Sequence, residues 1–371
     1  MEAIKNFINA CAVPSRMFPV IVLLFFFVFP VNSFFEKYNK LFFLDRLWTK
    51  KGGIFLFSTL TMFLSIGMLD ENFRHTVSKP DNLPIVGLIY ASLFFLWVAL
   101  SQARENDLRL EKNEKPKEWH DSQEKILVWP DLVSIELIAM LFALGFLFTW
   151  GILVDAPLEE PANLATSPNP AKAPWYFLAL QEMLVYFDPA LAGVIFPTLI
   201  VVGLMAIPYI DNNHKATGYY TFKERKLAIT IFLFGWIILW LFMMVIGTIL
   251  RGPNWNFYGP FEYWDPHKVE ALTNINLSEY LYVIGLNMGL PGNIFIREAP
   301  GIFLISLYFI GGGFLLTKTV FKNLFKSLGP LRYSFFLVLL LFATSLPIKM
   351  TLRWLFNLKY IVSIPEFFFN I

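Results

Sequence analysis

The stretch Glu159-Glu160-Pro161-Ala162-Asn163, continued by Ala171-Lys172-Ala173-Pro174-Trp175-Tyr176-Phe177, decides how this chain is organised. It lies between two apolar segments, residues 128–154 and 191–210. A helix of about 20 apolar residues crosses the hydrocarbon core of a bilayer, which is about 30 Å thick. A polar and aromatic loop between two such helices predicts the wall of a pocket at the bilayer surface.

The composition is that of an integral membrane protein. Of 371 residues, 56% are hydrophobic and only 16% are charged, and the mean hydropathy is +0.56. A soluble domain carries about 25% charged residues. The net charge of +2 is spread along the chain, so no nucleic acid partner is expected. The single cysteine, Cys11, excludes an internal disulfide, a CxxCH haem attachment and a cysteine-bound iron–sulfur cluster.

The apolar runs predict an all-α integral membrane protein with about eight transmembrane helices. We expect the first run to be a retained span, because no convincing signal-peptide cleavage site follows it. The chain then divides into a three-span N-terminal extension (1–103), a charged and solvated connector (104–127), a central three-span module (128–252) and a C-terminal extension (253–371). The predicted spans are residues 17–35, 54–69, 83–100, 128–154, 191–210, 227–250, 301–317 and 333–350.

The distribution of lysine and arginine predicts the orientation, because loops on the cytoplasmic, electrically negative side carry more of them. One set of alternate loops, which includes the connector, holds 19 basic residues, whereas the other and longer set holds 11. The loop of residues 155–190, with one lysine, and both termini are therefore expected on the positive side. Lys349, Arg353 and Lys359 fit this topology least well.

From Trp129 to Gly252 the chain resembles the C-terminal half of cytochrome b, and above all subunit IV of cytochrome b6f-type complexes. The motifs occur in the order found in that family. They are Trp129-Pro130-Asp131-Leu132, Glu160-Pro161-Ala162-Asn163 with Thr166-Ser167-Pro168, Ala173-Pro174-Trp175-Tyr176-Phe177, Pro197, and Ile207-Pro208-Tyr209-Ile210.

The resemblance implies a subunit of a Rieske/cytochrome b quinol:cytochrome c oxidoreductase (bc1/b6f-like) of a respiratory chain in a bacterial energy-transducing membrane. It implies quinol oxidation coupled to electron transfer and proton translocation. The partners would be a haem-bearing cytochrome b6-like subunit, a Rieske iron–sulfur protein and a c-type cytochrome, in a dimeric complex within membrane lipid. A positive-side quinone pocket would be lined by Ala173, Pro174, Trp175, Tyr176 and Phe177.

The chain departs from the family where a proton acceptor is expected. The family's glutamate is Pro174 here, and proline cannot take a proton, although quinol oxidation releases two. Glu182 is the proposed replacement, because in a helix from Trp175 it would lie two turns further on the same face. The alternative is a carboxylate that simply faces water. Asp188 is the second choice, unless Asp188-Pro189 only marks a helix start, and Tyr176 is the third.

The aromatic residues of the motif have two interpretations. Trp175 and Tyr176 either line the pocket or belong to the interfacial aromatic belt of a membrane protein. The resemblance also implies a negative-side quinone pocket with Asp131, and Glu136 is a second candidate as an ionisable group inside a span. Asp131 could also act as a first-turn acid of its helix, and Glu136 could reach the membrane surface.

The histidines predict that b haems belong to a partner subunit. Bis-histidine ligation needs histidines on facing spans, whereas all four histidines of this chain, His75, His120, His214 and His267, fall in predicted loops. No zinc-type spacing, P-loop or GxGxxG is present.

The extensions outside the module carry weaker signals. Six aromatic residues within 255–264 indicate either an interfacial anchor or a docking platform for a redox partner. The first three spans are expected to be scaffold. Pro174 also leaves a second hypothesis for the whole chain: a non-catalytic structural or assembly subunit of a respiratory membrane complex.

Overall fold

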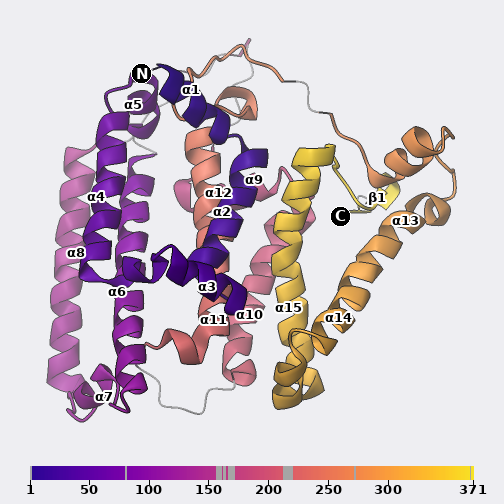
Figure 1. The fold of residues 1–371 in the computed structure, drawn as a ribbon. Helices are drawn as coiled ribbons and strands as arrows, with labels where there is room; N and C mark the ends of the chain where they lie inside the picture. The colour runs from indigo at the N-terminus through magenta and orange to yellow at the C-terminus, as the bar shows by residue number, and fades with distance from the viewer. Residues whose placement is uncertain are drawn as a thin grey trace. The chain divides into compact units, whose positions relative to one another are not determined.

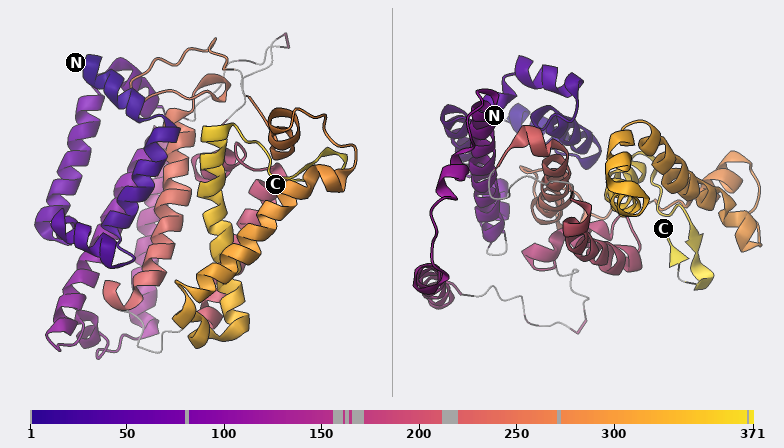
Figure 2. Two further views of the ribbon diagram at one scale, coloured as in Figure 1. Left: turned by 45° about the vertical axis from the view of Figure 1, so that its right-hand side comes forward. Right: turned by 90° about the horizontal axis from the view of Figure 1, so that it is seen from below.

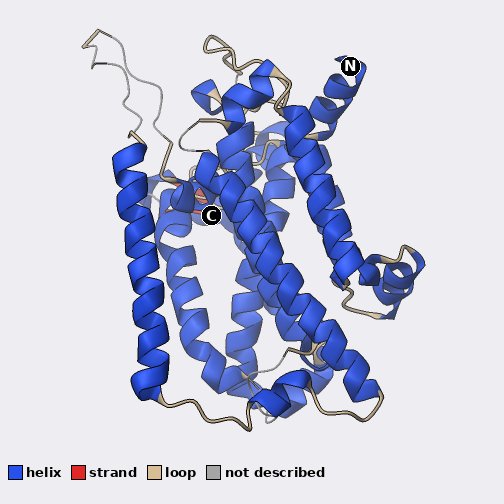
Figure 3. Ribbon diagram, turned by 90° about the vertical axis from the view of Figure 1, so that its left-hand side faces the viewer, coloured by secondary structure: helices blue, strands red, loops and turns tan. Residues whose placement is uncertain are grey.

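The structure is a computed structural model that describes residues 2–371 except 80–81, 156–160, 162–163, 166–171, 212–219, 271–272 and 368. Figure 3 shows that helices dominate it. Among the described residues, six helices or helix series are long and apolar enough to cross a membrane. The first three are α6 (Leu83–Glu111), η2 with α8 (Val128–Leu132, Val133–Leu153) and η4 with α10 (Leu191–Ile195, Phe196–Ile210). The fourth, Phe222–Leu250, begins with α11 (Phe222–Leu233) and ends with η6 (Ile246–Leu250). The last two are Ile294–Lys318, which begins with α13 (Ile294–Ser306) and ends with α14 (Gly313–Lys318), and α15 (Lys322–Phe356).

Two bent helix pairs raise the number of candidate spans to eight. Helices α1 (Glu2–Cys11) and α2 (Pro14–Val28) meet at 75°, and α4 (Lys50–Gly67) and α5 (Glu71–Val77) meet at 115°. The predicted all-α membrane fold is therefore confirmed. The shorter elements are α3 (Ser33–Leu41), η1 (Leu44–Trp48), α7 (Lys117–Asp121), η3 (Trp175–Phe177), α9 (Leu178–Met183), η7 (Pro253–Trp255), η8 (Glu279–Gly285), β1 (Ser363–Ile364), η10 (Pro365–Phe367) and β2 (Phe369–Asn370).

Several predicted span boundaries were wrong for identifiable reasons. The first apolar run is interrupted: α2 ends at Val28 and α3 begins at Ser33. Pro30 lacks an N–H group and disfavours helical geometry in the residue before it, and the Asn32 side chain accepts a hydrogen bond from Phe35 N (3.1 Å) as the cap of α3. The seventh span starts at Ile294 rather than at residue 301, because its charged side chains are paired, as described below.

The chain forms two compact units. One consists of residues 26–169 and 216–230. Here α4 and α6 lie side by side (Figure 1), joined by a hydrogen bond of 3.0 Å between the Thr61 and Tyr90 hydroxyls. Trp97 Nε1 also donates to Leu47 O at 3.1 Å.

The connector belongs to this first unit and is only partly solvated. Helix α6 extends into the connector and ends at Glu111. Two connector residues in this helix, Asn106 and Asp107, are buried. The Asn106 amide donates to Glu118 Oε2 (2.7 Å) and to Tyr220 O (2.9 Å), and Asp107 accepts from Lys223 N. These bonds hold the connector against the start of α11.

The other unit consists of residues 1–25, 170–215 and 231–371. Its aromatic core joins α2, α12 (Phe242–Val245), the turn after α9 and α15. The Phe18 ring contacts Phe242 and Trp354, and Trp354 packs edge-on against Tyr186. The helical hairpin of α13, α14 and α15 is visible in both views of Figure 2. Gly313 permits its close packing, since a Cβ there would lie 3.2 Å from Leu337.

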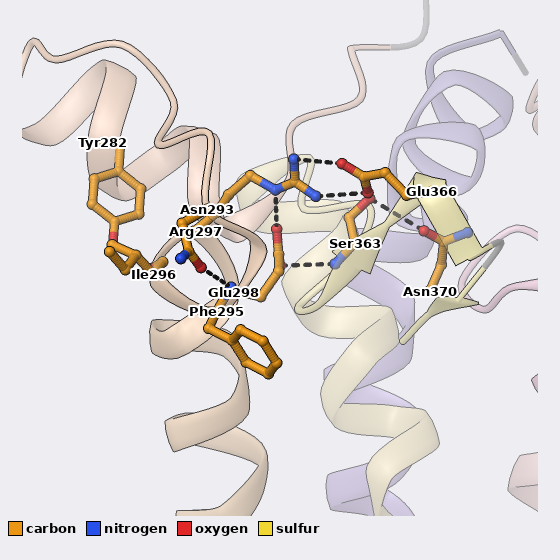
Figure 4. A network of polar contacts seen from close by, with 9 residues as sticks. All are labelled: Tyr282, Asn293, Phe295, Ile296, Arg297, Glu298, Ser363, Glu366 and Asn370. Atoms are coloured by element: carbon orange, nitrogen blue, oxygen red, sulfur yellow. Dashed lines mark hydrogen bonds and ion pairs between the residues drawn. The ribbon is translucent and has the colours of Figure 1, made fainter.

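The C-terminal residues return to the start of α13 (Figure 4). Strands β1 and β2 pair antiparallel, with Ser363 opposite Asn370. Gly301 of α13 packs directly on this segment, because a Cβ at Gly301 would lie 2.1 Å from Ile361 O. The aromatic stretch 255–264 is likewise folded into the unit: Tyr258 is fully buried, and its hydroxyl donates to Asp265 O at 2.7 Å.

Candidate functional site

The Pro-Trp-Tyr stretch forms a short helix fixed at its start. Pro174 precedes η3, which leads directly into α9. Ala173 N donates to Gln181 Oε1 at 2.7 Å. Lys172 Nζ binds two backbone carbonyls at the end of η6, Thr248 O at 2.9 Å and Arg251 O. A cation suits the negative end of a helix dipole, so Lys172 ties the loop to the end of the later span that finishes at Leu250.

Glu182 lies at the centre of a buried ionic cluster. Its side chain is 0% exposed. Arg251 donates from Nη2 to Oε1 at 2.9 Å and from Nε to Oε2 at 3.1 Å, and the Tyr186 hydroxyl donates to Oε1 at 2.8 Å. The alternative of a carboxylate facing water is therefore wrong, because both oxygens are held inside the protein.

The partners of Glu182 are kept in their donating forms. Burial, followed by the Glu182 carboxylate, raises the pKa of the Tyr186 phenol well above its usual value. Burial alone would lower the pKa of Arg251, but the charge and hydrogen bonds of Glu182 raise it above its usual value. Breaking such a buried pair typically costs about 3–5 kcal/mol.

The aromatic side chains of the motif lie beside this cluster in the chain but are far more open. Tyr176 and Phe177 are 49% and 51% exposed, and Trp175 is half-buried. The three rings are in contact, with centroids 5.5 Å apart for Trp175 and Tyr176 and 4.7 Å for Tyr176 and Phe177. This face could receive a flat apolar ring.

Asp188 marks a helix start, as one of its two interpretations predicted. Its Oδ1 accepts from Ala190 N at 3.0 Å, and its carbonyl accepts from Ala192 N at 2.9 Å. Its Oδ2 has a second partner, Asn370 Nδ2 at 3.1 Å. The carboxylate thus also connects the stretch to the C-terminal extension.

The two negative-side candidates lie in the other unit. Asp131 is in the first turn of the η2–α8 series, as its structural interpretation predicted. Both Asp131 and Glu136 are exposed. Within the motif, Glu159, Glu160, Ala162, Asn163 and Ala171 lie outside the described residues, whereas Pro161 is described.

The histidines lie in different parts of the chain. His75 and His120 lie in the short helices α5 and α7 rather than in loops, His75 and His267 are exposed, and His214 is outside the described residues. Among the described residues, no group of three or more histidine, cysteine, aspartate or glutamate side chains could hold a metal ion.

Three residues that hold the site were missed in the sequence: Arg251, Tyr186 and Lys172. Tyr186 lies one helical turn after Glu182, a spacing that could have suggested the contact. Arg251 stands at the end of an apolar span, but its pairing with a residue 69 positions away has no local sequence signal.

The fold and the site define a polytopic helical membrane protein with an exposed aromatic segment followed in the chain by a buried ion pair. Residues 161–259 match the family described as cytochrome b (C-terminal)/b6/petD, which supports a cytochrome b C-terminal-like module in this part of the chain. The match includes Pro174 to Phe177, Glu182 and Arg251, whereas Asp131, Glu136 and the C-terminal helices lie outside it. No solved structure matches the chain. The family match supports membership of a bc1/b6f-type complex.

Proposed function

We propose that this chain is the subunit IV-like part of a Rieske/cytochrome b quinol oxidoreductase, enlarged at both ends. The observation that carries the proposal is the family match over the stretch where an exposed aromatic face adjoins a buried carboxylate. The assembled complex would oxidise quinol at this face. A haem-bearing subunit, a Rieske protein and a c-type cytochrome would take the electrons.

The residues have separate roles in this proposal. Ala173, Pro174, Trp175, Tyr176 and Phe177 line the quinol pocket on the positive side of the membrane. Glu182 accepts one quinol proton, which requires that one of its bonds from Arg251 opens, and Tyr176 is the second catalytic candidate, on the exposed aromatic face. Asp131 and Glu136 serve the negative-side quinone pocket.

A second candidate function is a structural or assembly subunit without catalysis. Two observations favour it: Pro174 replaces the family's acid, and Glu182 is sealed by Arg251 and Tyr186. In that case the ion pair only joins α9 to the end of η6.

The test uses the native complex, purified through a tag on this chain. Quinol-dependent reduction of its b haems would be recorded for wild type, Glu182→Gln, and the control Glu270→Gln, an exposed carboxylate paired only with Lys268 at 3.1 Å among the described contacts. We expect haem to co-purify and Glu182→Gln to slow reduction at least tenfold, or about 1.4 kcal/mol of barrier.

The other outcomes identify which part fails. An unchanged rate in Glu182→Gln would remove Glu182 from the proton path but leave the complex assignment intact. Absence of a haem-bearing partner, or of quinol-dependent reduction in wild type, would favour the structural subunit.

A further inference from the structure

Helix α1 is amphipathic, and its apolar face points out of the protein. Five residues share this face, because a helix turns once every 3.6 residues. They are Ala3, Ile4, Phe7, Ala10 and Cys11, and all five are exposed. The Ile4 and Phe7 side chains are 62% and 69% exposed. A surface helix of a soluble protein would instead turn its apolar face toward the core.

The opposite, polar face of α1 is the one that contacts the protein. Lys5 and Asn9 lie on this face and are partly buried. Asn9 Oδ1 accepts a hydrogen bond from Phe261 N at 2.9 Å. The packing is close, since a Cβ at Gly259 would lie 2.5 Å from Asn9 Oδ1. Helix α1 is therefore fixed through its polar side on the aromatic stretch 255–264.

The exposed face of α1 continues a surface that faces lipid. Helix α1 leads directly into α2 after a bend of 75° (Figure 1). In α2, which belongs to a candidate membrane span, Val20, Leu23 and Leu24 are more than half exposed. Apolar side chains on the outside of a span are covered by acyl chains. The bend turns α1 out of the direction of the span, so its apolar face meets the same lipid at the edge of the bilayer.

The length of α2 supports this placement. With 15 residues, α2 is about 22 Å long at about 1.5 Å per residue. The hydrocarbon core is about 30 Å thick, so α2 alone falls short of it. A helix that lies in the membrane surface buries its apolar face about 5–10 Å deep, which makes up the difference. The aromatic stretch beneath α1 supplies tyrosine and tryptophan, the residues enriched at membrane surfaces.

We propose that α1 is an interfacial helix that binds the lipid leaflet. Its axis lies along the membrane surface. The side chains of Ala3, Ile4, Phe7, Ala10 and Cys11 insert among the acyl chains, and the polar face rests on stretch 255–264. The ligand is the apolar part of any bilayer lipid, and no particular headgroup is required. This binding surface does not depend on the proposed quinol chemistry.

The helix also connects the membrane surface to the candidate site. Stretch 255–264, on which α1 packs, holds two residues of that site. Arg251 Nη1 donates to Trp255 O at 3.0 Å, and Lys172 Nζ lies 4.9 Å from the centre of the Trp264 ring. Insertion of α1 into the leaflet would therefore keep these anchors of the Pro-Trp-Tyr segment at the bilayer surface.

The single cysteine provides the experiment, because Cys11 lies on the proposed lipid face and is exposed. The full-length chain, with the subunits that accompany it, is labelled with bimane and reconstituted in phosphatidylcholine–phosphatidylglycerol vesicles. The quenchers are bromine atoms on the acyl chains and iodide in the water. The Cys11→Ser protein gives the background signal of other subunits, which is subtracted.

Three single-cysteine variants in the Cys11→Ser background complete the set. Phe7→Cys places a second probe on the lipid face. Asn6→Cys is the matched control, since Asn6 is also exposed but lies about 100° around the helix from Phe7. His267→Cys reports full exposure to water, because the His267 side chain is 93% exposed.

We expect brominated lipid to quench the probes at Cys11 and Phe7→Cys at least about threefold more than those at Asn6→Cys and His267→Cys, and iodide to show the reverse order. Equal quenching at Phe7→Cys and Asn6→Cys by brominated lipid would overturn the proposal. So would a Cys11 probe shielded from both quenchers, which would mean that another protein covers this face. If Phe7→Cys fails to assemble, Cys11 of the wild type decides by the same comparison.

Discussion

At the residue scale, the pairing of Glu182 with Arg251 explains how an acid can persist in an apolar surrounding. A lone buried carboxylate would be strongly destabilising. Arg251 and Tyr186 provide three hydrogen bonds to it, so the charge is both balanced and solvated by the protein. The ion pair joins α9 to the end of a span that begins far away in the sequence.

This pairing predicts strong coupling between the two residues. Arg251→Met leaves Glu182 buried without its partner, and we expect a loss of about 3–5 kcal/mol. The double variant Arg251→Met/Glu182→Leu should lose clearly less than the sum of the two single variants. Thermal denaturation of the solubilised protein measures this, and additive effects would show that the pair contributes no coupling.

A second residue-scale prediction concerns the stability of the C-terminal segment at low pH, which depends on the pair of Arg297 and Glu366. Arg297 lowers the folded-state pKa of Glu366. The pair therefore stabilises the fold at pH values above the unfolded pKa, about 4.3, and this contribution disappears as the pH falls through the lowered folded pKa. We expect hydrogen exchange in residues 361–371 to rise below about pH 4. In Glu366→Gln that part of the acid dependence should be absent, and an identical acid response in both proteins would contradict the assignment.

At the element scale, α13 depends on the absence of a side chain at Gly301. A Cβ there would meet Ile361 O at 2.1 Å and Val362 Cγ2 at 2.8 Å. Backbone cannot yield as a flexible side chain can, so we expect Gly301→Ala to destabilise the protein by about 1–3 kcal/mol through overpacking. Limited proteolysis should then cleave residues 357–371 more readily.

The matched control for this helix change is Gly193→Ala. Gly193 is also helical, and a Cβ there would meet nothing within 4 Å. Alanine has the higher helix propensity, so this variant should be at least as stable as wild type. Equal proteolysis of Gly301→Ala and Gly193→Ala would show that the contact with residues 361–362 is dispensable.

The elements differ in how well the sequence predicted them. Long apolar runs such as residues 191–210 and 227–250 were found because transfer to lipid depends mainly on composition. The start of α13 was missed because Arg297 and Glu298 look incompatible with a span until Glu366 and Ser363 are known to partner them. Local patterns do not reveal partners that come from distant segments.

At the scale of the whole molecule, local sequence motifs again predict part of the site, whereas contacts between distant segments remain hidden in the sequence. The motif around Pro174 to Phe177 placed the candidate pocket, and the family match includes it. The bond from Asn370 to Asp188 could not be predicted, since it is a tertiary contact between the module and the C-terminal extension.

The orientation of the molecule is a prediction from charge alone, and the single cysteine makes it testable. In a Cys11→Ser background, His267→Cys places a thiol at an exposed position, since the His267 side chain is 93% exposed, in a loop predicted on the positive side. Ser122→Cys places one at an exposed position of the connector, which is predicted on the negative side. The excess of basic residues in the connector and its equivalent loops, 19 against 11, requires that the two thiols lie on opposite sides.

A membrane-impermeant maleimide applied to sealed vesicles of both orientations reads out the topology. We expect it to label His267→Cys only from the positive side and Ser122→Cys only from the negative side. Labelling of both thiols from one side would mean that an even number of spans lies between residues 122 and 267. The Pro-Trp-Tyr loop would then lose its support as a positive-side site. A reversed pattern would keep the odd number of spans but place the proposed quinol pocket on the opposite side of the membrane.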